Sequence, residues 1–590
     1  MADHFTQAQE RAIDHFKGPA LVLAGPGSGK TLVITERVCR LIAAHQVPAS
    51  QILVITFTKA AAVQMEERFS QKMPQEHPWF GTFHSFFYYI LRTYSRTFPR
   101  TLIPANVKQS ILRSACKTVL QDTSQGILDA ADQLLGLYIN LGLDLQKLPV
   151  SDEIGPKDVE AIYRIYADAL KQEGYFDFDD LQISCLNLLR SNLEIRRRIV
   201  RVFPFILVDE CQDMNPVQYE ILKLLTGPEK SVLLVGDDDQ SVYRFRGADV
   251  SLMRQFLRDY SPVTEILLDQ NFRSAKCIVE ASMKVIADNK TRFEKTIRPK
   301  DGVTQGVVIR SFQHRLDMNE RISSFLREQP DLSKCAVICR TNRELGEMAR
   351  RLRRENISYQ MREAAKSVFE EDWYLDLEAY LKLGQDINDR KYILRVANKP
   401  NRFITREQIV NFPYPPATLV VQVKHLKGMR PALALKYIWI GIGYGRYLKN
   451  SLEREEGRYE EILEQYEEIA AEMEQYPDVK DWLDYVESER QLERKESRNK
   501  TNQSETGVHL MTMHGSKGLE YETVILPDLN EGRMPRGSHL SDEEIEEERR
   551  LLYVAMTRAK KSLEIYYISG EEGHLKRPSM FLHRLAENKA

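Results

Sequence analysis

The sequence predicts an α/β protein built on two parallel sheets, each interrupted by a mainly helical insertion. Short apolar runs end at polar or glycine-rich turns, as buried strands do. Helix-like stretches separate many of these runs, and strands that alternate with helices are typical of parallel sheets. Two long regions, residues 91–199 and 376–505, lack this alternation of strands and helices and are predicted to be mainly helical. Strand candidates resume after each of them.

The strand candidates form two sets. The first set comprises residues 20–24, 52–56, 205–208, 231–235 and 265–268, and the second comprises residues 307–311, 336–339, 509–513, 523–526 and 563–568. We therefore expect a first domain at residues 1–90 and 200–275, with the insertion 91–199. We expect a second domain at residues 276–375 and 506–590, with the insertion 376–505.

Length and composition indicate a globular protein of several compact units. A chain of 590 residues is too long for one hydrophobic core. The hydrophobic share of 43% and the charged share of 28% are typical of globular chains and exclude a disordered or membrane-embedded one. The most apolar segment, residues 433–448, is interrupted by Lys436 and Arg446, which favours a buried helix over a membrane span. The first residues lack a hydrophobic signal core, so we expect a cytoplasmic location and no membrane partner.

Charge and cysteine content leave the function open. A net charge of −2 does not indicate a nucleic-acid-binding protein, although acidic faces elsewhere can offset a basic groove. No cysteine pair has the C-x-x-C spacing of a zinc or iron–sulfur site. Cys335 and Cys339 lie in an apolar, strand-like run, which favours core packing. Motifs must therefore decide the function.

The first motif is a phosphate-binding loop. Gly25-Pro-Gly-Ser-Gly-Lys-Thr31 follows a strand candidate and precedes a helix-like run at residues 32–44. Glycines let backbone N–H groups approach phosphate oxygens, and the helix N-terminus favours an anion. We expect the phosphates to be cradled by Gly25, Gly27, Ser28 and Gly29. Lys30 would reach the β- and γ-phosphates and the Thr31 hydroxyl would ligate Mg²⁺. The loop alone indicates nucleotide binding, which kinases, GTPases and transporters share.

A pair of carboxylates follows another apolar strand candidate, Phe205-Ile-Leu-Val-Asp-Glu210. Asp209 would hold Mg²⁺, and Glu210 would orient and deprotonate an attacking water. A glutamate at this position suits hydrolysis better than transfer of the phosphoryl group to an alcohol. Solvated acids at a strand end are the alternative, and the phosphate-binding loop makes that alternative weaker.

Six further segments resemble a known family. In chain order they are Phe5-Thr-Gln-Ala-Gln9, Asp209-Glu-Cys-Gln-Asp213, Val235-Gly-Asp-Asp-Asp-Gln-Ser-Val-Tyr-Arg-Phe-Arg-Gly-Ala248, Asn271-Phe-Arg-Ser274, Val508-His-Leu-Met-Thr-Met-His-Gly-Ser-Lys-Gly-Leu-Glu-Tyr521 and Glu548-Arg-Arg-Leu-Leu-Tyr-Val-Ala-Met-Thr-Arg-Ala-Lys560. Their content and order resemble the superfamily 1 helicases of the UvrD/PcrA/Rep family. The resemblance implies two RecA-like P-loop NTPase domains with ATP between them. It also implies 3′–5′ movement on single-stranded DNA.

The resemblance assigns the nucleotide contacts. Gln9 would form a two-point hydrogen bond with adenine, and Phe272, where the family usually has Tyr, would stack on the base. Arg37 would pack near the base or sugar, and Glu520 would contact the ribose. Gln240 would sense the γ-phosphate.

Two arginines complete the catalytic assignment. Arg273 and Arg558 would approach the γ-phosphate from the partner domain side as arginine fingers, stabilising charge in the transition state. A surface salt bridge is the alternative reading for either arginine.

The resemblance also assigns DNA contacts. Thr56-Phe-Thr58 and Gly81-Thr-Phe-His-Ser85 are similar to DNA-contact motifs of the family. Phe57 and Phe245 are candidate stacking platforms, which suit a motor because every base has a π-face. Phe245 stands where the family usually has Trp, and core packing is the alternative for both rings. Phosphate contacts are assigned to Thr82, His84 and Arg246.

Two activities remain open at this point. The first is an ATP-dependent 3′–5′ DNA helicase or translocase acting on single strands and single/double-strand junctions, in repair, recombination or replication, with ATP and Mg²⁺ as cofactors. The alternative is a DNA-stimulated ATPase that removes proteins from DNA or serves a repair or defence complex and unwinds little alone. The sequence indicates no particular protein partner.

Overall fold

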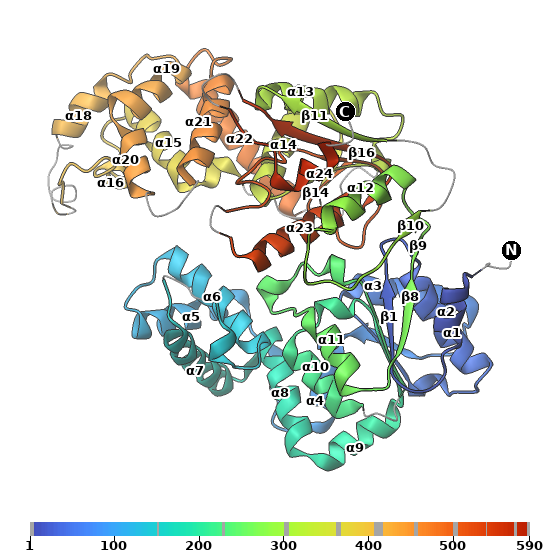
Figure 1. The fold of residues 1–590 in the computed structure, drawn as a ribbon. Coiled ribbons are helices and arrows are strands. Elements are labelled where there is room, and N and C mark those ends of the chain that lie inside the picture. Colours follow the sequence, from blue (N-terminus) through green and yellow to red (C-terminus); the bar gives the residue numbers. More distant parts are fainter. Residues whose placement is uncertain are drawn as a thin grey trace. The chain divides into compact units, whose positions relative to one another are not determined.

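The computed structural model describes residues 5–149, 153–226, 231–299, 306–361, 367–405, 407, 417–452, 458–498, 506–537, 540–570 and 575–586. The chain forms two compact units, Met1–Thr304 and Gln305–Ala590. In Figure 1 the first unit runs from blue to green and the second from green to red.

A six-stranded parallel sheet organises the first unit. Its strands lie in the order β3-β2-β6-β7-β1-β8. They are β1 (Ala20–Ala24), β2 (Ile52–Thr56), β3 (Trp79–Thr82), β6 (Phe205–Val208), β7 (Ser231–Gly236) and β8 (Thr264–Leu268). Because β1, β2 and β7 are buried along their whole length, helices must cover both faces of the sheet.

Alternate residues of each strand point into two separate cores. Val22 packs with Val33 and Val38 of α2 (Lys30–Ala43) in one core. Leu21 packs with Phe86 of α4 (Phe83–Tyr94) in the other. The same sheet is also covered by α1 (Gln7–Asp14), α3 (Lys59–Lys72), α10 (Pro216–Leu225) and α11 (Ser251–Asp259). This alternation, with a period of two residues, produces a sheet that is apolar on both faces.

The parallel arrangement brings the motifs to one edge. The carboxyl ends of β1, β6, β7 and β8 lead into the phosphate-binding loop, Asp209, Asp237 and Asp269 respectively. Parallel neighbours have their carboxyl ends on the same edge, and ligands of open α/β sheets bind there.

Helices between α4 and β6 form the first insertion. They are α5 (Ala105–Val119), α6 (Gln125–Asn140), α7 (Pro156–Glu173), α8 (Phe178–Ser191) and α9 (Leu193–Val202). α5, α6 and α7 lie together in Figure 1. Their shared core includes Leu112, Leu135 and Ile162. A short strand pair, β4 (Thr101–Leu102) with β5 (Tyr175–Phe176), accompanies them.

The second unit repeats the scheme with another six-stranded parallel sheet. The order is β11-β16-β15-β12-β14-β13. The strands are β11 (Val307–Phe312), β12 (Cys335–Cys339), β13 (Tyr359–Met361), β14 (Val508–Thr512), β15 (Tyr521–Leu526) and β16 (Ala559–Ile568). The helices α13 (Arg315–Arg327), α14 (Asn342–Arg354) and α23 (Asp542–Met556) belong to this part of the unit.

The second insertion is also mainly helical. It contains α15 (Asp372–Gln385), α16 (Arg390–Val396), α18 (Ala417–Lys424), α19 (Pro431–Lys436), α20 (Tyr444–Ser451), α21 (Arg458–Met473) and α22 (Val479–Arg498). A π-helical turn, Tyr437–Gly441, follows α19, so the apolar segment 433–448 is broken into pieces. None of the described helices is long and apolar enough to cross a membrane.

The fold class predicted from the sequence is confirmed. Every predicted strand is present within a few residues of its predicted ends, and both long regions are helical in the described residues. The first compact unit extends further than residue 275 and includes α12 (Lys276–Ile286), and Phe293 beyond this helix packs against its core. The segment after α12 adds β10 (Arg298–Pro299), which pairs with β9 (Gln270–Asn271).

Candidate functional site

The phosphate-binding loop connects β1 to α2 through two left-handed glycines. Gly27 has φ of 65° and Gly29 has φ of 85°, a backbone region that other residues enter only with strain. A Cβ on Gly27 would lie 2.6 Å from Cβ of Arg273, so a larger residue is excluded there. The N-terminus of α2 has no side-chain cap. Backbone N–H groups are therefore available for an anion.

A buried hydroxyl in this loop also fits a phosphate. Ser28 is 2% exposed, and its Oγ has no hydrogen-bond partner among the described residues. Buried polar atoms normally have partners, so this hydroxyl suits a ligand oxygen. Thr31 lies in the first turn of α2, and Asp209 follows β6 with 5% exposure. A hydroxyl and a carboxylate are the hard oxygen ligands that Mg²⁺ prefers.

Gln9 lies directly against the loop. Its Oε1 accepts a hydrogen bond from Thr6 N at 2.9 Å, closing the cap of α1, and its Nε2 donates to Ser28 O at 3.0 Å. The residue is only 4% exposed. These two contacts use one donor and one acceptor position of the amide, which leaves a second donor and a second acceptor position for the adenine contact expected from the sequence.

Glu210 faces the loop lysine. Its carboxylate Oε1 lies 3.8 Å from Nζ of Lys30, and its backbone is left-handed, with φ of 51°. A non-glycine residue in this conformation is strained, and such strain is concentrated at functional sites. Gln212 Nε2 donates to the other oxygen, Oε2, at 2.5 Å. The carboxylate is thus held by two neighbours beside the phosphate-binding loop.

Gln212 links Glu210 to the next strand end. The residue is fully buried, and its Oε1 accepts a hydrogen bond from Asp237 N at 3.0 Å. Asp237 Oδ2 in turn accepts from Nε2 of Gln240 at 2.6 Å. Gly236 permits this arrangement, because a Cβ there would lie 2.6 Å from Oε1 of Gln212. The predicted base and the predicted γ-phosphate sensor therefore belong to one hydrogen-bond chain.

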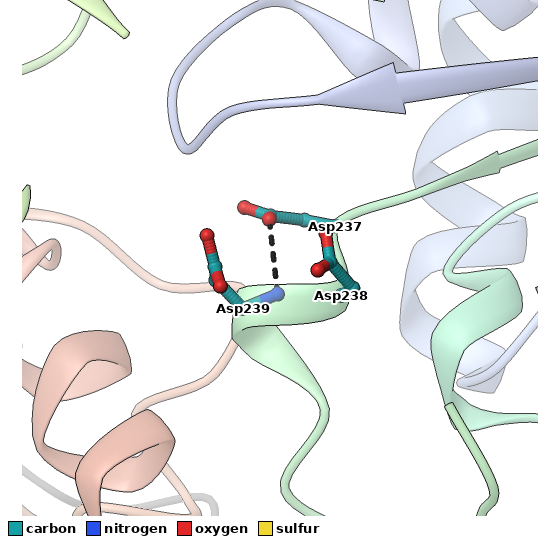
Figure 2. A group of neighbouring side chains, drawn as sticks. All are labelled: Asp237, Asp238 and Asp239. Carbon is teal, nitrogen blue, oxygen red and sulfur yellow. Dashed lines mark hydrogen bonds between the residues drawn. The ribbon is translucent and has the colours of Figure 1, made fainter. Parts of the chain in front are cut away.

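Three consecutive aspartates, Asp237, Asp238 and Asp239, lie buried at the carboxyl end of β7 (Figure 2). Lys295 forms ion pairs with all three, and Arg292 donates two hydrogen bonds to Asp239, at 2.9 and 2.7 Å. Burial would lower the pKa of Lys295, but the three carboxylates outweigh it and hold that pKa above its ordinary value. Lys295 and Arg292 thus supply positive charge to this cluster.

The segment after β8 lies beside the phosphate-binding loop. Asn271 Nδ2 donates to Pro26 O at 2.7 Å, and Phe272 N donates to Gly27 O at 2.9 Å. The Phe272 side chain is 41% exposed, which leaves its ring free to stack on a base. Arg273 lies against Gly27 and so belongs to the same unit as the loop. The expectation that it approaches from the partner domain is wrong, because β9 follows β8 directly.

Arg37 is placed differently from the expectation. It is 1% exposed and donates to Ala12 O of α1 at 3.3 Å and to Ser231 Oγ at 3.5 Å. Burial lowers the pKa of its guanidinium to about 10. A base or sugar could reach Arg37 only if α1 moved, so the predicted contact is not preformed.

Two predicted nucleotide contacts lie in the second unit. Arg558 follows α23 and donates from Nε to Val554 O at 2.8 Å and from a terminal nitrogen to Leu519 O at 3.2 Å. Glu520 forms an ion pair with Lys560 at 2.6 Å. Both therefore have partners in their own unit, and their roles toward ATP stay predictions.

Aromatic rings from two strand ends form a cluster on the first unit. Phe57 follows β2 and stacks on Tyr243, with ring centroids 4.9 Å apart. Phe245 lies 6.1 Å from Tyr243 and is 42% exposed, and the Arg246 guanidinium lies 5.5 Å from its ring centroid. Tyr243 is not among the DNA contacts predicted from the sequence. The alternation of Tyr, Phe and arginines after Gln240 was the signal that could have identified it.

Thr82 and His84 lie at the start of α4. Thr82 Oγ1 accepts a hydrogen bond from Ser85 N at 3.2 Å and caps this helix. His84 meets the exposed ring of Phe178 edge-on at 6.1 Å, and burial lowers the pKa of its imidazole. The cap shows a structural role for Thr82, and both phosphate contacts remain predictions.

The fold and this site define a P-loop NTPase with two RecA-like α/β domains. A model of the UvrD/REP helicase N-terminal domain matches residues 5–261, and a model of the UvrD-like helicase C-terminal domain matches residues 266–426 and 424–570. The chain belongs to the UvrD-like helicase family.

Curated relatives match along nearly the whole chain. DNA helicase II of Haemophilus influenzae is 30% identical over 672 residues, covering 99% of this chain and 87% of the relative. The putative ATP-dependent DNA helicase YjcD of Bacillus subtilis is 29% identical, covering 98% and 81%. The ATP-dependent DNA helicase PcrA of Staphylococcus aureus is 28% identical, covering 100% and 87%.

Proposed function

We propose that this protein uses ATP hydrolysis to move 3′–5′ along single-stranded DNA and to unwind duplex at single/double-strand junctions. One observation carries the proposal: residues 237–246 contact both the nucleotide site and the exposed aromatic cluster. The stretch begins at Asp237, which is bonded to Gln212 and Gln240 beside the hydrolytic carboxylate. It ends at Phe245 and Arg246, next to the exposed aromatic cluster. A change at the nucleotide can thereby alter the grip on DNA.

The nucleotide half of the machinery would be provided by residues around the loop. The loop backbone and Lys30 bind the phosphates, while Phe272 stacks on adenine and Gln9 reads its edge. Mg²⁺, held by Thr31 and Asp209, would neutralise charge that develops on the phosphate oxygens. Glu210 takes the proton of the attacking water, which its position beside Lys30 supports.

Two guanidinium groups would stabilise the transition state. Arg273 is held against Gly27 of the loop, which supports its contact with the γ-phosphate. The family resemblance assigns Arg558 to the same charge and Glu520 to the ribose.

The DNA half of the machinery would be provided by stacking. Phe57, Tyr243 and Phe245 present adjoining rings, and bases stack on such rings whatever their identity. Arg246, exposed beside them, would pair with a phosphate. The relatives named DNA helicase II and ATP-dependent DNA helicase support DNA as the strand. Repair, recombination or replication is the process in which we place this activity.

The first test is steady-state ATP hydrolysis with and without single-stranded DNA. We expect strong stimulation by DNA, and Lys30→Ala should abolish hydrolysis because the loop loses its phosphate-binding cation. Hydrolysis that is indifferent to DNA would contradict the proposal.

Polarity and unwinding need a second measurement. Duplexes with a 3′ or a 5′ single-stranded tail are compared in a strand-displacement assay. Displacement only from the 3′-tailed substrate supports the proposed direction. DNA-stimulated hydrolysis without displacement would instead favour the alternative, an ATPase that clears proteins from DNA or works within a larger complex.

A further inference from the structure

The segment between α12 and the end of the first unit carries no assigned role, yet it contacts two parts of the nucleotide site. Arg292 and Lys295 bind the three aspartates after β7. Ile297 packs on the phosphate-binding loop, since a Cβ on Gly25 would lie 2.4 Å from its Cδ1. Arg298 N then donates to Asp269 O at 2.7 Å, where β10 pairs with β9. We call residues 292–299 the strap.

The strap is held against the aspartates at consecutive points. Phe293 N donates to Asp238 Oδ2 at 2.6 Å, and Arg292 binds Asp239 through two nitrogens. Arg254 of α11 also contacts the strap. It donates a hydrogen bond to Arg292 O at 2.6 Å, and its guanidinium lies 5.2 Å from the Phe293 ring centroid. These contacts fix where the Lys295 side chain enters the cluster.

Lys295 is the centre of the cluster. Its side chain is fully buried, as are those of Asp237, Asp238 and Asp239, and its Nζ bonds to a carboxylate oxygen of each. Three buried carboxylates with two cations leave one net negative charge. A buried charge is tolerated only where it is paired and hydrogen-bonded, so the position of each carboxylate depends on this ammonium group.

Asp237 transmits that dependence to the reacting groups. Its Oδ1 binds Lys295 while its Oδ2 accepts from Gln240, so one carboxylate is shared between the lysine and the predicted phosphate sensor. Its backbone N–H holds Gln212, which holds Glu210. Without Lys295, Asp237 would be free to rotate or to take a proton, and both Gln240 and Glu210 would lose their fixed support.

We propose that Lys295 is a positioning residue for ATP hydrolysis, acting through Asp237 on Gln240 and Glu210. The inference rests on the proposed function and deepens it. Because the Lys295 ammonium group is buried among the three aspartates, we expect its loss to leave nucleotide binding intact and to slow the chemical step. Small misplacements of catalytic groups lower rates on the order of 100-fold.

The test compares Lys295→Met with the wild type in steady-state ATP hydrolysis at saturating single-stranded DNA. Methionine keeps the length of the side chain and removes the charge. We expect kcat to fall by about 10- to 100-fold, with KM for ATP and the affinity for a fluorescent ADP analogue within about threefold of the wild type. Lys276→Met, at an exposed lysine of α12, is the matched control and should leave both constants unchanged.

A double variant separates positioning from charge balance. It combines Asp238→Asn, which removes one negative charge, with Lys295→Met, which removes one positive charge, so the net charge of the cluster equals that of the wild type. The asparagine oxygen can still accept a hydrogen bond from Phe293 N. We expect kcat of this double variant to stay low relative to Asp238→Asn alone. Recovery to the level of Asp238→Asn would overturn the proposal, because Lys295 would then serve charge balance only. Failure of both Lys295 variants to fold, read from thermal unfolding, would overturn it as well.

The two proposals can fail separately. A wild type whose hydrolysis does not respond to DNA contradicts the proposed function, while basal hydrolysis still tests Lys295. A wild type that responds to DNA, with an unchanged kcat in Lys295→Met, overturns the positioning role alone.

Discussion

The ring of Phe57 stacks on the ring of Tyr243, with centroids 4.9 Å apart and planes inclined by 19°. The two residues come from different strand ends, since Phe57 follows β2 and Tyr243 follows β7 and its short helical turn. A tyrosine held in this way presents a preorganised surface, and Phe245 and Arg246 continue it. Segments far apart in sequence thus build one candidate platform for DNA bases.

Removal of the central ring should weaken the grip on DNA. We expect Tyr243→Ala to reduce the binding free energy for a short single strand by about 1–3 kcal/mol, because each stacked base contributes that much. Fluorescence anisotropy with a labelled oligonucleotide measures the change. Tyr89→Ala, at an exposed tyrosine of α4, is the control. Equal affinities for Tyr243→Ala and this control would mean that Tyr243 only packs against Phe57.

The exposed ring of Phe245 should affect movement more than basal hydrolysis. We expect Phe245→Ala to slow translocation per ATP consumed while ATP hydrolysis without DNA stays near the wild-type rate, since the ring is 42% exposed and lies beside Tyr243 in the aromatic cluster. Phe245→Trp should strengthen DNA binding, because a larger ring offers more stacking area. Streptavidin displacement from DNA measures movement. An unchanged translocation rate in Phe245→Ala would show that this ring is not a platform.

Glu210 offers a test of the hydrolytic assignment. We expect Glu210→Gln to retain ATP binding and lose most hydrolysis, by about 100-fold or more, because the amide cannot accept the proton of water. Filter binding of ATP and phosphate release separate the two effects. Glu66→Gln, at an exposed glutamate of α3, should behave as the wild type. Normal turnover in Glu210→Gln would remove Glu210 as the base.

Local signals explain what the sequence predicted well. The strands Ala20–Ala24 and Phe205–Val208 were predicted with their observed ends, because each is a short apolar run closed by polar residues. The phosphate-binding loop was identified from its glycines and flanking elements. The strands Trp79–Thr82 and Tyr359–Met361 were not predicted, since both are short and carry too few apolar residues to stand out.

Contacts between distant segments explain what the sequence missed. Lys295 lies 58 residues after Asp237, and no periodicity links them. The position of Arg37 in the helix that follows the loop suggests a nucleotide contact, but its helix face points toward Ala12 and the core. Arg273 was expected to act from the partner domain, whereas β9 follows β8 within the first unit. Such outcomes depend on tertiary packing, which motif spacing does not encode.

The ion pairs of Glu464 in the second unit predict that the stability of this unit depends on pH. Glu464 of α21 forms ion pairs with Arg533 and Lys576 and lies 3.7 Å from Arg315. These contacts link the helical insertion to the α/β part of the second unit. Burial would raise the pKa of Glu464, but Arg533, Arg315 and Lys576 outweigh it and lower this pKa to about 2. Because the folded pKa lies below the unfolded one, the stabilisation is complete above about pH 5 and is lost as pH falls toward 2.

Removal of this carboxylate should therefore destabilise the second unit at neutral pH. We expect Glu464→Gln to lower the free energy of unfolding by about 1–3 kcal/mol at pH 7, after allowance for partial exposure, and by progressively less as the pH falls below 4. Urea unfolding followed by circular dichroism at several pH values measures the difference. Glu467→Gln, at an exposed glutamate of the same helix, is the control. If Glu464→Gln lowered the free energy of unfolding equally at pH 7 and pH 3, packing of the side chain rather than its charge would be the source of the stabilisation.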